Sequence, residues 1–248
     1  MKLSKRLLTI GKMCEPAICA ADIGTDHAYI PIWLVQNGIA QRAIASDINQ
    51  GPLDRARHSI AENGLQDSID LRLGDGFAAV RPGEADEAII SGIGGDLMIR
   101  LLEGGADVTA LMHTLVLSPH SEHARVRRFL MDSGMRIADE TMVLDDGKYY
   151  TVIKAHPGRK ETQAWSEAEL LYGRYTLRSG DVTVHDFLLK EIDKFTKIKN
   201  NIDPENGRGT PREYYAACGG LKLCSEALDI FLAEAPETKK TEAIYGMR

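Results

Sequence analysis

Short apolar segments alternate with amphipathic helical patterns over the first 155 residues, and this alternation restricts the possible folds more than any other feature of the chain. Strands that alternate with helices of this length form βαβ units and therefore a parallel sheet. The expected strands span residues 18–23, 42–47, 68–73, 86–91, 114–119, 135–144 and 149–155. The expected helices between them span residues 28–37, 52–63, 95–103 and 121–132. The sequence therefore predicts a doubly wound, Rossmann-like α/β sheet.

The last two expected strands flank Asp-Asp-Gly-Lys at residues 145–148, which is a strong signal for a β-hairpin. The sheet should therefore have seven strands, five parallel strands followed by an antiparallel pair. Among doubly wound folds, this ending is typical of class I methyltransferases and not of dinucleotide-binding dehydrogenases.

Beyond residue 155 the strand signals stop, and residues 156–162 have the composition of a linker. Helical patterns then follow over residues 166–177, 185–201 and 211–234. We therefore expect two domains, an α/β domain over residues 1–158 and a smaller helical domain over residues 159–248.

Charge and hydropathy restrict the location and partners of the chain. It has 30 Lys and Arg residues against 36 Asp and Glu residues, a net charge of −6, which excludes indiscriminate coating of nucleic acid but allows a local basic patch. No apolar run approaches the ~18 residues that a membrane span needs. The four cysteines have C-x4-C and C-x5-C spacings, which do not match zinc sites. We expect a cytoplasmic protein without a metal and without membrane contact.

The turn after the first expected strand carries the sharpest chemical signal, Asp22-Ile-Gly24-Thr-Asp26-His27. A dinucleotide site needs glycine where this chain has Asp26, because the backbone there approaches a pyrophosphate. The Asp26 carboxylate would repel that diphosphate. S-Adenosylmethionine fits better, since it carries a sulfonium and an ammonium group and no phosphate.

Three acids follow the first three strands in order, at the strand ends where open α/β sheets bind ligands. We expect Asp22 to face the cationic amino-acid half of S-adenosylmethionine, Asp47 to accept from the ribose hydroxyls, and Asp75 to accept from the adenine amino group. The alternative is that these acids cap helices or close turns. The other expected cofactor-binding residues are Gly24, His27, Ile48, Asn49, Gly74, Gly76, Ser91 and Gly92.

The fourth strand ends in Ser91-Gly92-Ile93-Gly94-Gly95. Methyltransferases that act on exocyclic amino groups usually have an Asn/Asp-Pro-Pro-aromatic tetrad here, which this chain lacks. The glycines offer backbone N–H groups and room for a flat group to approach. We expect Gly92, Gly94 and Gly95 to form a wall of the substrate site; the alternative is a tight strand–helix connection.

Several segments together resemble the bacterial tRNA (adenine-22-N1)-methyltransferase family (TrmK type). They are KLSKRL near the start, DIGTDHAYIP, SDINQGPLDRA, RLGDGF and the SGIGG turn. The resemblance implies a class I methyltransferase domain followed by a helical, coiled-coil-like domain, and methylation of N1 of adenine 22 in the D-arm of tRNA. Family members often have Gln-Pro-Asn after the fifth strand, where this chain has Ser118-Pro119-His120. If the asparagine contacts the base, His120 must do so differently.

Methylation of N1 places positive charge on the adenine ring, which a carboxylate can stabilise. Asp26 lies where an acid facing the methyl group would be, and we expect it to be catalytic; the alternative is that it caps the next helix. His27 and Tyr29 could frame the base, or simply pack. The other expected substrate contacts are Gly94, Gly95, Pro119, His120, Lys5, Arg6, Arg127, Lys194 and Lys197.

Other functions remain open at this level. One alternative is a methyltransferase that acts on another RNA, a protein or a small molecule. Another is a scaffold that binds cofactor and tRNA without catalysis. The helical domain could clamp tRNA or mediate dimerisation, and we expect a monomer or a weak homodimer.

Overall fold

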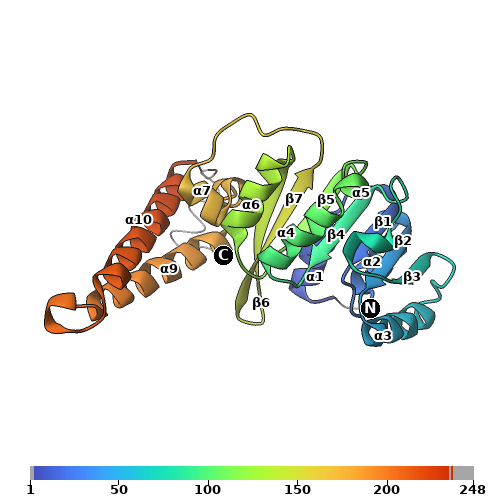
Figure 1. The fold of residues 1–248 in the computed structure, drawn as a ribbon, viewed down its shortest axis with the longest axis horizontal. Helices are drawn as coiled ribbons and strands as arrows, with labels where there is room; N and C mark the ends of the chain where they lie inside the picture. Colours follow the sequence, from blue (N-terminus) through green and yellow to red (C-terminus); the bar gives the residue numbers. More distant parts are fainter. Residues whose placement is uncertain (1–2, 235, 237–248) are drawn as a thin grey trace. The chain divides into compact units, whose positions relative to one another are not determined.

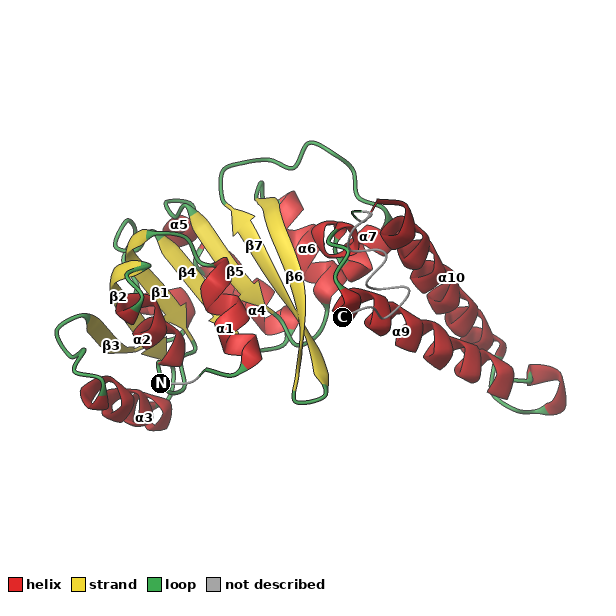
Figure 2. Cartoon of the chain, turned by 180° about the vertical axis from the view of Figure 1, so that it is seen from behind, coloured by secondary structure: helices red, strands yellow, loops and turns green. Residues whose placement is uncertain are grey.

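The computed structural model describes residues 3–234 and 236 and contains, within them, one seven-stranded sheet (Figures 1 and 2). The strand order is β3-β2-β1-β4-β5-β7-β6. The strands are β1 (Ala17–Ile23), β2 (Ala40–Asp47), β3 (Ile69–Leu73), β4 (Glu87–Ser91), β5 (Thr114–Ser118), β6 (Arg136–Asp145) and β7 (Lys148–His156). The predicted seven-stranded methyltransferase sheet is confirmed.

The sheet is parallel from β3 to β5 and antiparallel at its other end. β1 pairs in parallel with β2 and β4, β2 with β3, and β4 with β5. β7 runs antiparallel to both β5 and β6. The β6–β7 turn has Asp146 and Gly147 at φ 47° and 73°, as a two-residue hairpin turn requires. The predicted hairpin is therefore confirmed, and the carboxyl ends of β1 to β5 share one edge of the sheet.

Helices cover both faces of this sheet. The first unit contains α1 (Lys5–Met13), α2 (Tyr29–Gln36), α3 (Gln50–Glu62), η1 (Gly76–Ala79), α4 (Gly95–Gly104), α5 (Ala106–Thr109) and α6 (His123–Asp132). In Figures 1 and 2, α1 and α4 lie on opposite faces of the sheet. Ile10 of α1 and Leu34 of α2 pack with Ile89 and Val116 of the central strands. The two faces are buried, as the near-continuous apolar strands indicate.

The start of α1 is tied to the end of β6. The Ser4 hydroxyl accepts from the Leu7 amide and caps the helix. The Arg6 amide donates to the Asp145 carboxylate at 3.0 Å, which lowers the pKa of Asp145. These bonds place Arg6 at the edge of the sheet that carries the strand ends.

The chain divides into two compact units, Met1–Gln163 and Ala164–Arg248. The second unit is helical: α7 (Glu167–Tyr172), α8 (Arg174–Arg178), α9 (Val182–Asn201), η2 (Pro204–Asn206) and α10 (Pro211–Glu234). The pattern over 166–177 forms two short helices broken at Gly173, while 211–234 is one helix as expected. α9 and α10 form the long helical hairpin of Figure 1.

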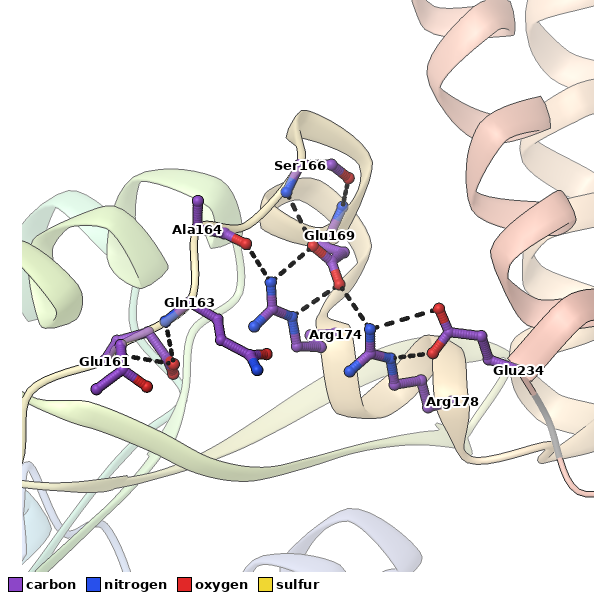
Figure 3. Close-up of polar contacts among 9 residues, drawn as sticks. Glu161, Gln163, Ala164, Ser166, Glu169, Arg174, Arg178 and Glu234 are labelled. Atoms are coloured by element: carbon purple, nitrogen blue, oxygen red, sulfur yellow. Dashed lines mark hydrogen bonds and ion pairs between the residues drawn. The ribbon is translucent and has the colours of Figure 1, made fainter.

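A polar network with Glu169 and Arg174 buried at its centre joins the elements of the second unit (Figure 3). Ser166 and Glu169 form a capping box at the start of α7. The Arg174 guanidinium donates to Glu169 at 2.7 Å, and Arg178 contacts both Glu169 and Glu234 of α10. Burial raises the pKa of Glu169, but these donors outweigh it and lower that pKa overall.

Two kinds of feature are absent from the described residues. Among them, no helix combines the length and the apolar character that crossing a membrane requires. Within the same part of the chain, no group of three or more His, Cys, Asp or Glu side chains could hold a metal ion.

Candidate functional site

A pocket of about 370 Å³ opens at the carboxyl ends of β1 and β4. It is lined by Arg6, Leu7, Asp22, Gly24, Thr25, Asp26, His27, Ala28, Tyr29, Ile30, Ser91, Gly92, Ile93 and His120. Open α/β sheets bind their ligands at this edge. The pocket thus brings together the expected catalytic acid, several expected cofactor-binding residues and several expected substrate contacts.

The turn after β1 bends sharply toward the end of β2. Gly24 has φ +80°, which side chains disfavour, and the amides of Gly24 and Thr25 donate to the Ser46 carbonyl at 2.9 and 2.8 Å. Asp22 is 6% exposed, and burial raises its pKa to about 6, with a smaller contribution from the nearby Asp47 charge, while the neighbouring Thr25 hydroxyl opposes the rise. A nearby positive charge stabilises the ionised form of a buried carboxylate whose pKa is raised. Asp22 therefore favours a cationic ligand group. The turn therefore fits the cationic half of S-adenosylmethionine.

The ends of β2 and β3 lie next to each other. The Gly74 amide donates to the Asp47 carbonyl at 3.0 Å, and the Asn49 amide donates to the Asp47 carboxylate at 2.7 Å. One carboxylate oxygen of Asp47 therefore closes a turn, which is the alternative role considered for this acid. Its second oxygen takes no part in that bond. Ile48 and Leu73 are 59% and 61% exposed at these strand ends, an apolar flank that a flat ring could cover.

Asp75 and Gly76 lie just beyond β3. Asp75 precedes η1, but within the described chain its side chain does not cap that helix, so the capping alternative does not account for this exposed acid. Gly76 lies close to α4: a Cβ there would be 2.6 Å from Leu101 Cδ2.

Asp26 lies in the loop between β1 and α2 and is 61% exposed at its side chain. The residue at the N-cap of α2 is Ala28, in the left-handed conformation with φ 54°. Asp26 therefore does not cap α2, and that alternative is wrong. Its Oδ1 atom accepts from Nε of Arg55 at 2.7 Å and also from Nη2 of Arg55, while its Oδ2 atom is 3.6 Å from Nε2 of His27. The sequence did not predict Arg55 as part of the site, because its approach to Asp26 depends on the packing of α3.

One aromatic pair lines this pocket, and a second pair joins His120 of the lining to Tyr150 beside it. The His27 and Tyr29 rings stack with centroids 4.9 Å apart and planes 12° apart. Elsewhere on the wall, the His120 ring is 5.8 Å from the Tyr150 ring, and the Arg6 guanidinium is 5.1 Å from the Tyr150 ring centroid. Tyr150 of β7 was not predicted, because nothing local in the sequence shows which strand residue meets the β5 loop.

His120 contacts Arg6, with Nη1 of Arg6 3.1 Å from Nε2 of His120. Because a guanidinium can only donate, Nε2 accepts, and the ring is neutral. Burial, the Arg6 charge and the Lys148 charge lower the pKa of His120. His120 therefore presents an uncharged ring to the pocket.

The glycines of the turn after β4 have different roles. Gly92 lines the pocket, and a Cβ there would be 3.7 Å from Nη1 of Arg6. Gly95 is buried, its amide donates to the Ser121 hydroxyl at 3.4 Å, and a Cβ there would be 2.6 Å from the Ser121 carbonyl oxygen. The expected substrate contact at Gly95 is wrong, because this glycine allows α4 to pack closely on residues 121–126. Gly94 is the N-cap of α4 and does not line the pocket.

One predicted tRNA contact is contradicted. Arg127 is 0% exposed, and its Nε donates to the buried Glu140 of β6 at 2.6 Å. It therefore cannot contact a phosphate at the surface. The prediction was wrong because the sequence alone does not show which face of α6 is buried. Pro119 is also buried and does not line the pocket, so it places His120 instead of meeting a ligand.

The remaining basic residues are exposed. Lys5 lies at the start of α1. On α9, Lys194 is paired with Glu191 at 2.9 Å and Lys197 with Asp193 at 2.6 Å. Because such exposed pairs are weak, these lysines stay available to a phosphate.

Comparisons with known proteins extend over the site and beyond it. Residues 3–153 match the protein family described as "Methyltransferase domain". The tRNA (adenine(22)-N(1))-methyltransferase of Bacillus subtilis (strain 168) is 36% identical over 191 residues, which cover 77% of this chain and 76% of that protein.

Two solved structures similar to this chain hold a ligand. M. capricolum TrmK in complex with the natural cofactor product S-adenosyl-homocysteine has a TM-score of 0.80 at 26% identity, covering 93% of this chain and 100% of that one. The Streptococcus pneumoniae protein Sp1610 in complex with S-adenosyl-L-methionine has a TM-score of 0.80 at 27% identity, covering 92% and 100%.

Proposed function

This chain belongs to the family of tRNA (adenine(22)-N(1))-methyltransferases, and from this premise we propose how it transfers a methyl group from S-adenosyl-L-methionine to N1 of adenine 22 in tRNA. One observation supports the assignment above all: a single pocket is lined by the buried Asp22, by Asp26 and by the stacked His27 and Tyr29. The family relation favours this reaction over another substrate and over a silent scaffold.

The cofactor supplies an electrophilic methyl group on a sulfonium. Asp22 binds the cationic amino-acid half, because a positive charge stabilises the ionised form of this buried acid, whose pKa is raised. Asp47 accepts from the ribose hydroxyls with the oxygen that Asn49 does not use. Asp75 accepts from the adenine amino group, and Ile48 and Leu73 cover the adenine ring.

The target base enters the same pocket from the tRNA side. It must leave its helical stack, because N1 is hidden in a paired adenine. The His27 and Tyr29 rings offer a stacking surface, and the neutral His120 with Arg6 and Tyr150 forms a second wall. These contacts orient N1 toward the methyl group.

Asp26 is the catalytic residue in this proposal. As N1 forms its bond to the methyl carbon and the carbon–sulfur bond breaks, positive charge develops on the adenine ring. The Asp26 carboxylate stabilises that charge and can accept a proton from the exocyclic amine. A separate general base for N1 is unnecessary, because this nitrogen is already a nucleophile.

The two units have separate tasks in this scheme. Residues 1–158 carry the methyltransferase site, and the helical domain of residues 159–248 contacts tRNA through Lys194 and Lys197 of α9. Lys5 and Arg6 add basic charge near the pocket. We assign the enzyme to the cytoplasm as a monomer or weak homodimer.

The reaction is tested by incubating the protein with labelled S-adenosylmethionine and total tRNA, followed by mapping of the modified nucleoside. We expect 1-methyladenosine at position 22, and no label in a tRNA transcript whose adenine 22 is replaced by guanine. Label on another nucleotide, or on protein alone, would contradict the proposed substrate.

Cofactor binding should weaken as the pH falls through about 6. The pKa of Asp22 is raised to about 6, so below this pH the acid is protonated and loses its attraction for the cofactor ammonium. Between pH 7 and pH 5, where the ammonium stays charged, calorimetry should show an affinity loss of about tenfold. Asp22→Asn should bind the cofactor weakly at both pH values, so that its affinity does not depend on pH. If this variant kept the parental pH dependence, the titrating group would be a histidine and not Asp22.

Charge reversal at Lys194 and Lys197 should weaken tRNA binding and flatten its salt dependence. Each lost phosphate contact removes about 0.7–0.9 from the slope of log K against log salt, so the double variant should lose about 1.5. Filter binding over a salt series gives the slope, with Lys222→Glu on α10 as the control for net charge. A parental slope in the double variant would show that this face of α9 is only solvated.

A further inference from the structure

Arg55 lies outside the pocket yet binds a residue that lines it. Nε and Nη2 of its guanidinium both donate to Oδ1 of Asp26, and Nε does so at 2.7 Å. The Oδ2 atom of Asp26 is left on the side of His27, 3.6 Å from Nε2 of that ring. Asp26 and His27 line the pocket, whereas Arg55 does not. One carboxylate oxygen is therefore held by Arg55, and the other lies beside His27, which lines the pocket.

Arg55 belongs to a helix that packs in the core. It belongs to α3, which begins just after the Asp47 turn and packs into the core through Ala56 and Ile60. The guanidinium lies over the first turn of that helix, where a Cβ on Gly51 would be 3.8 Å from Nη1 of Arg55. Arg55 thus connects the loop after β1 to a helix whose Ala56 and Ile60 are packed in the core.

Asp26 needs such a connection, because its loop anchors the backbone around it but leaves its side chain exposed. The loop is anchored before it by the Thr25 amide on the Ser46 carbonyl and after it by the Ile32 amide on the Ala28 carbonyl. With its side chain 61% exposed, Asp26 would sample several rotamers without a partner. Electrostatic stabilisation of a developing charge depends on a group that is already oriented.

We propose that Arg55 is a positioning residue for methyl transfer, which holds Oδ1 of Asp26 so that Oδ2 faces the target base. This inference rests on the proposed function, in which Asp26 acts on the methylated ring. Arg55 acts only through Asp26 and touches neither the cofactor nor the base. Its effect must therefore fall on the rate of the chemical step and vanish when the Asp26 charge is removed.

The experiment is a double-mutant cycle of Arg55→Ala and Asp26→Asn, read as single-turnover rates with saturating cofactor and tRNA. Arg55→Ala should lower the rate about 10- to 100-fold, because a misplaced catalytic group costs about that much. In the Asp26→Asn background the same change should alter the rate less than about threefold, since the residue through which Arg55 acts is already disabled.

Two further variants separate positioning from a general loss of charge. Arg55→Lys keeps the charge but not the two-pronged donor, and should recover part of the lost rate. Arg57→Ala removes a more exposed arginine, paired with Asp54 on the same helix, and should stay within about twofold of the parent. Cofactor affinity by calorimetry and the melting temperature should be parental in every Arg55 variant.

Each opposing result overturns the inference in a recognisable way. Equal rate losses from Arg55→Ala in both backgrounds would mean that Arg55 acts independently of Asp26. A raised KM for tRNA with a parental rate at saturation would assign Arg55 to a tRNA phosphate. A parental rate in Asp26→Asn alone would instead refute the role of Asp26 in the proposed function, whatever Arg55 does.

Discussion

Replacing Asp26 by asparagine should lower the single-turnover rate of methyl transfer by about 10²–10⁴-fold. Asparagine keeps the size of the side chain and an oxygen that can accept from Arg55, but it removes the charge that stabilises the methylated ring. Cofactor affinity should change little, because Asp22, Asp47 and Asp75 remain. Rapid-quench measurements with labelled cofactor and excess enzyme give the rate directly.

The control for this variant is its thermal stability. Asp26 is exposed and the N-cap of α2 is Ala28, so Asp26→Asn should melt at the parental temperature. A variant with near-parental turnover would show that the positive charge is stabilised by another group. A lower melting temperature together with a slower rate would point to a structural role for Asp26.

Removing the Arg127 side chain should destabilise the first unit by about 3–5 kcal/mol, the cost of leaving one partner of a buried ion pair uncompensated. Arg127 and Glu140 are both 0% exposed at their side chains, and they join α6 to β6. Arg127→Met keeps most of the apolar volume and isolates the loss of charge. Urea unfolding followed by circular dichroism measures the change.

The matched variant replaces both partners, Arg127→Met with Glu140→Leu. It should recover much of the lost stability, since no buried charge is then unpaired. If Arg127 served tRNA instead, Arg127→Met would leave the unfolding midpoint unchanged and reduce the salt slope of tRNA binding. Such an outcome would contradict the buried position of this residue.

The strands and the terminal hairpin could be predicted because their signals are local and repeated. Apolar runs alternating with amphipathic helices indicate parallel βαβ units, and Asp146-Gly147 adopts the left-handed angles of a tight hairpin. The helix expected over 166–177 is interrupted at Gly173, since a periodic apolar pattern does not show where a backbone turns.

The candidate site divides in the same way. Asp22, Asp26 and Gly24 were predictable, because they lie in one short turn whose chemistry excludes a diphosphate. Arg55 of α3 contacts Asp26, and Tyr150 of β7 contacts Arg6 and His120, only when the chain is folded. Arg127 and Gly95 were misassigned, because a helix position can face solvent or a neighbouring element with the same local sequence.

The sequence by itself determined the α/β class, the hairpin at the end of the sheet and the acids that end its first strands, since each depends on residues close together in the chain. The tertiary structure alone decided that Arg55 holds Asp26. It also decided that Arg6 contacts both His120 and Tyr150, and that Arg127 is buried against Glu140. The reason is physical: side-chain contacts between distant segments depend on how whole helices pack on the sheet, and no local pattern encodes the rotation of a helix about its own axis.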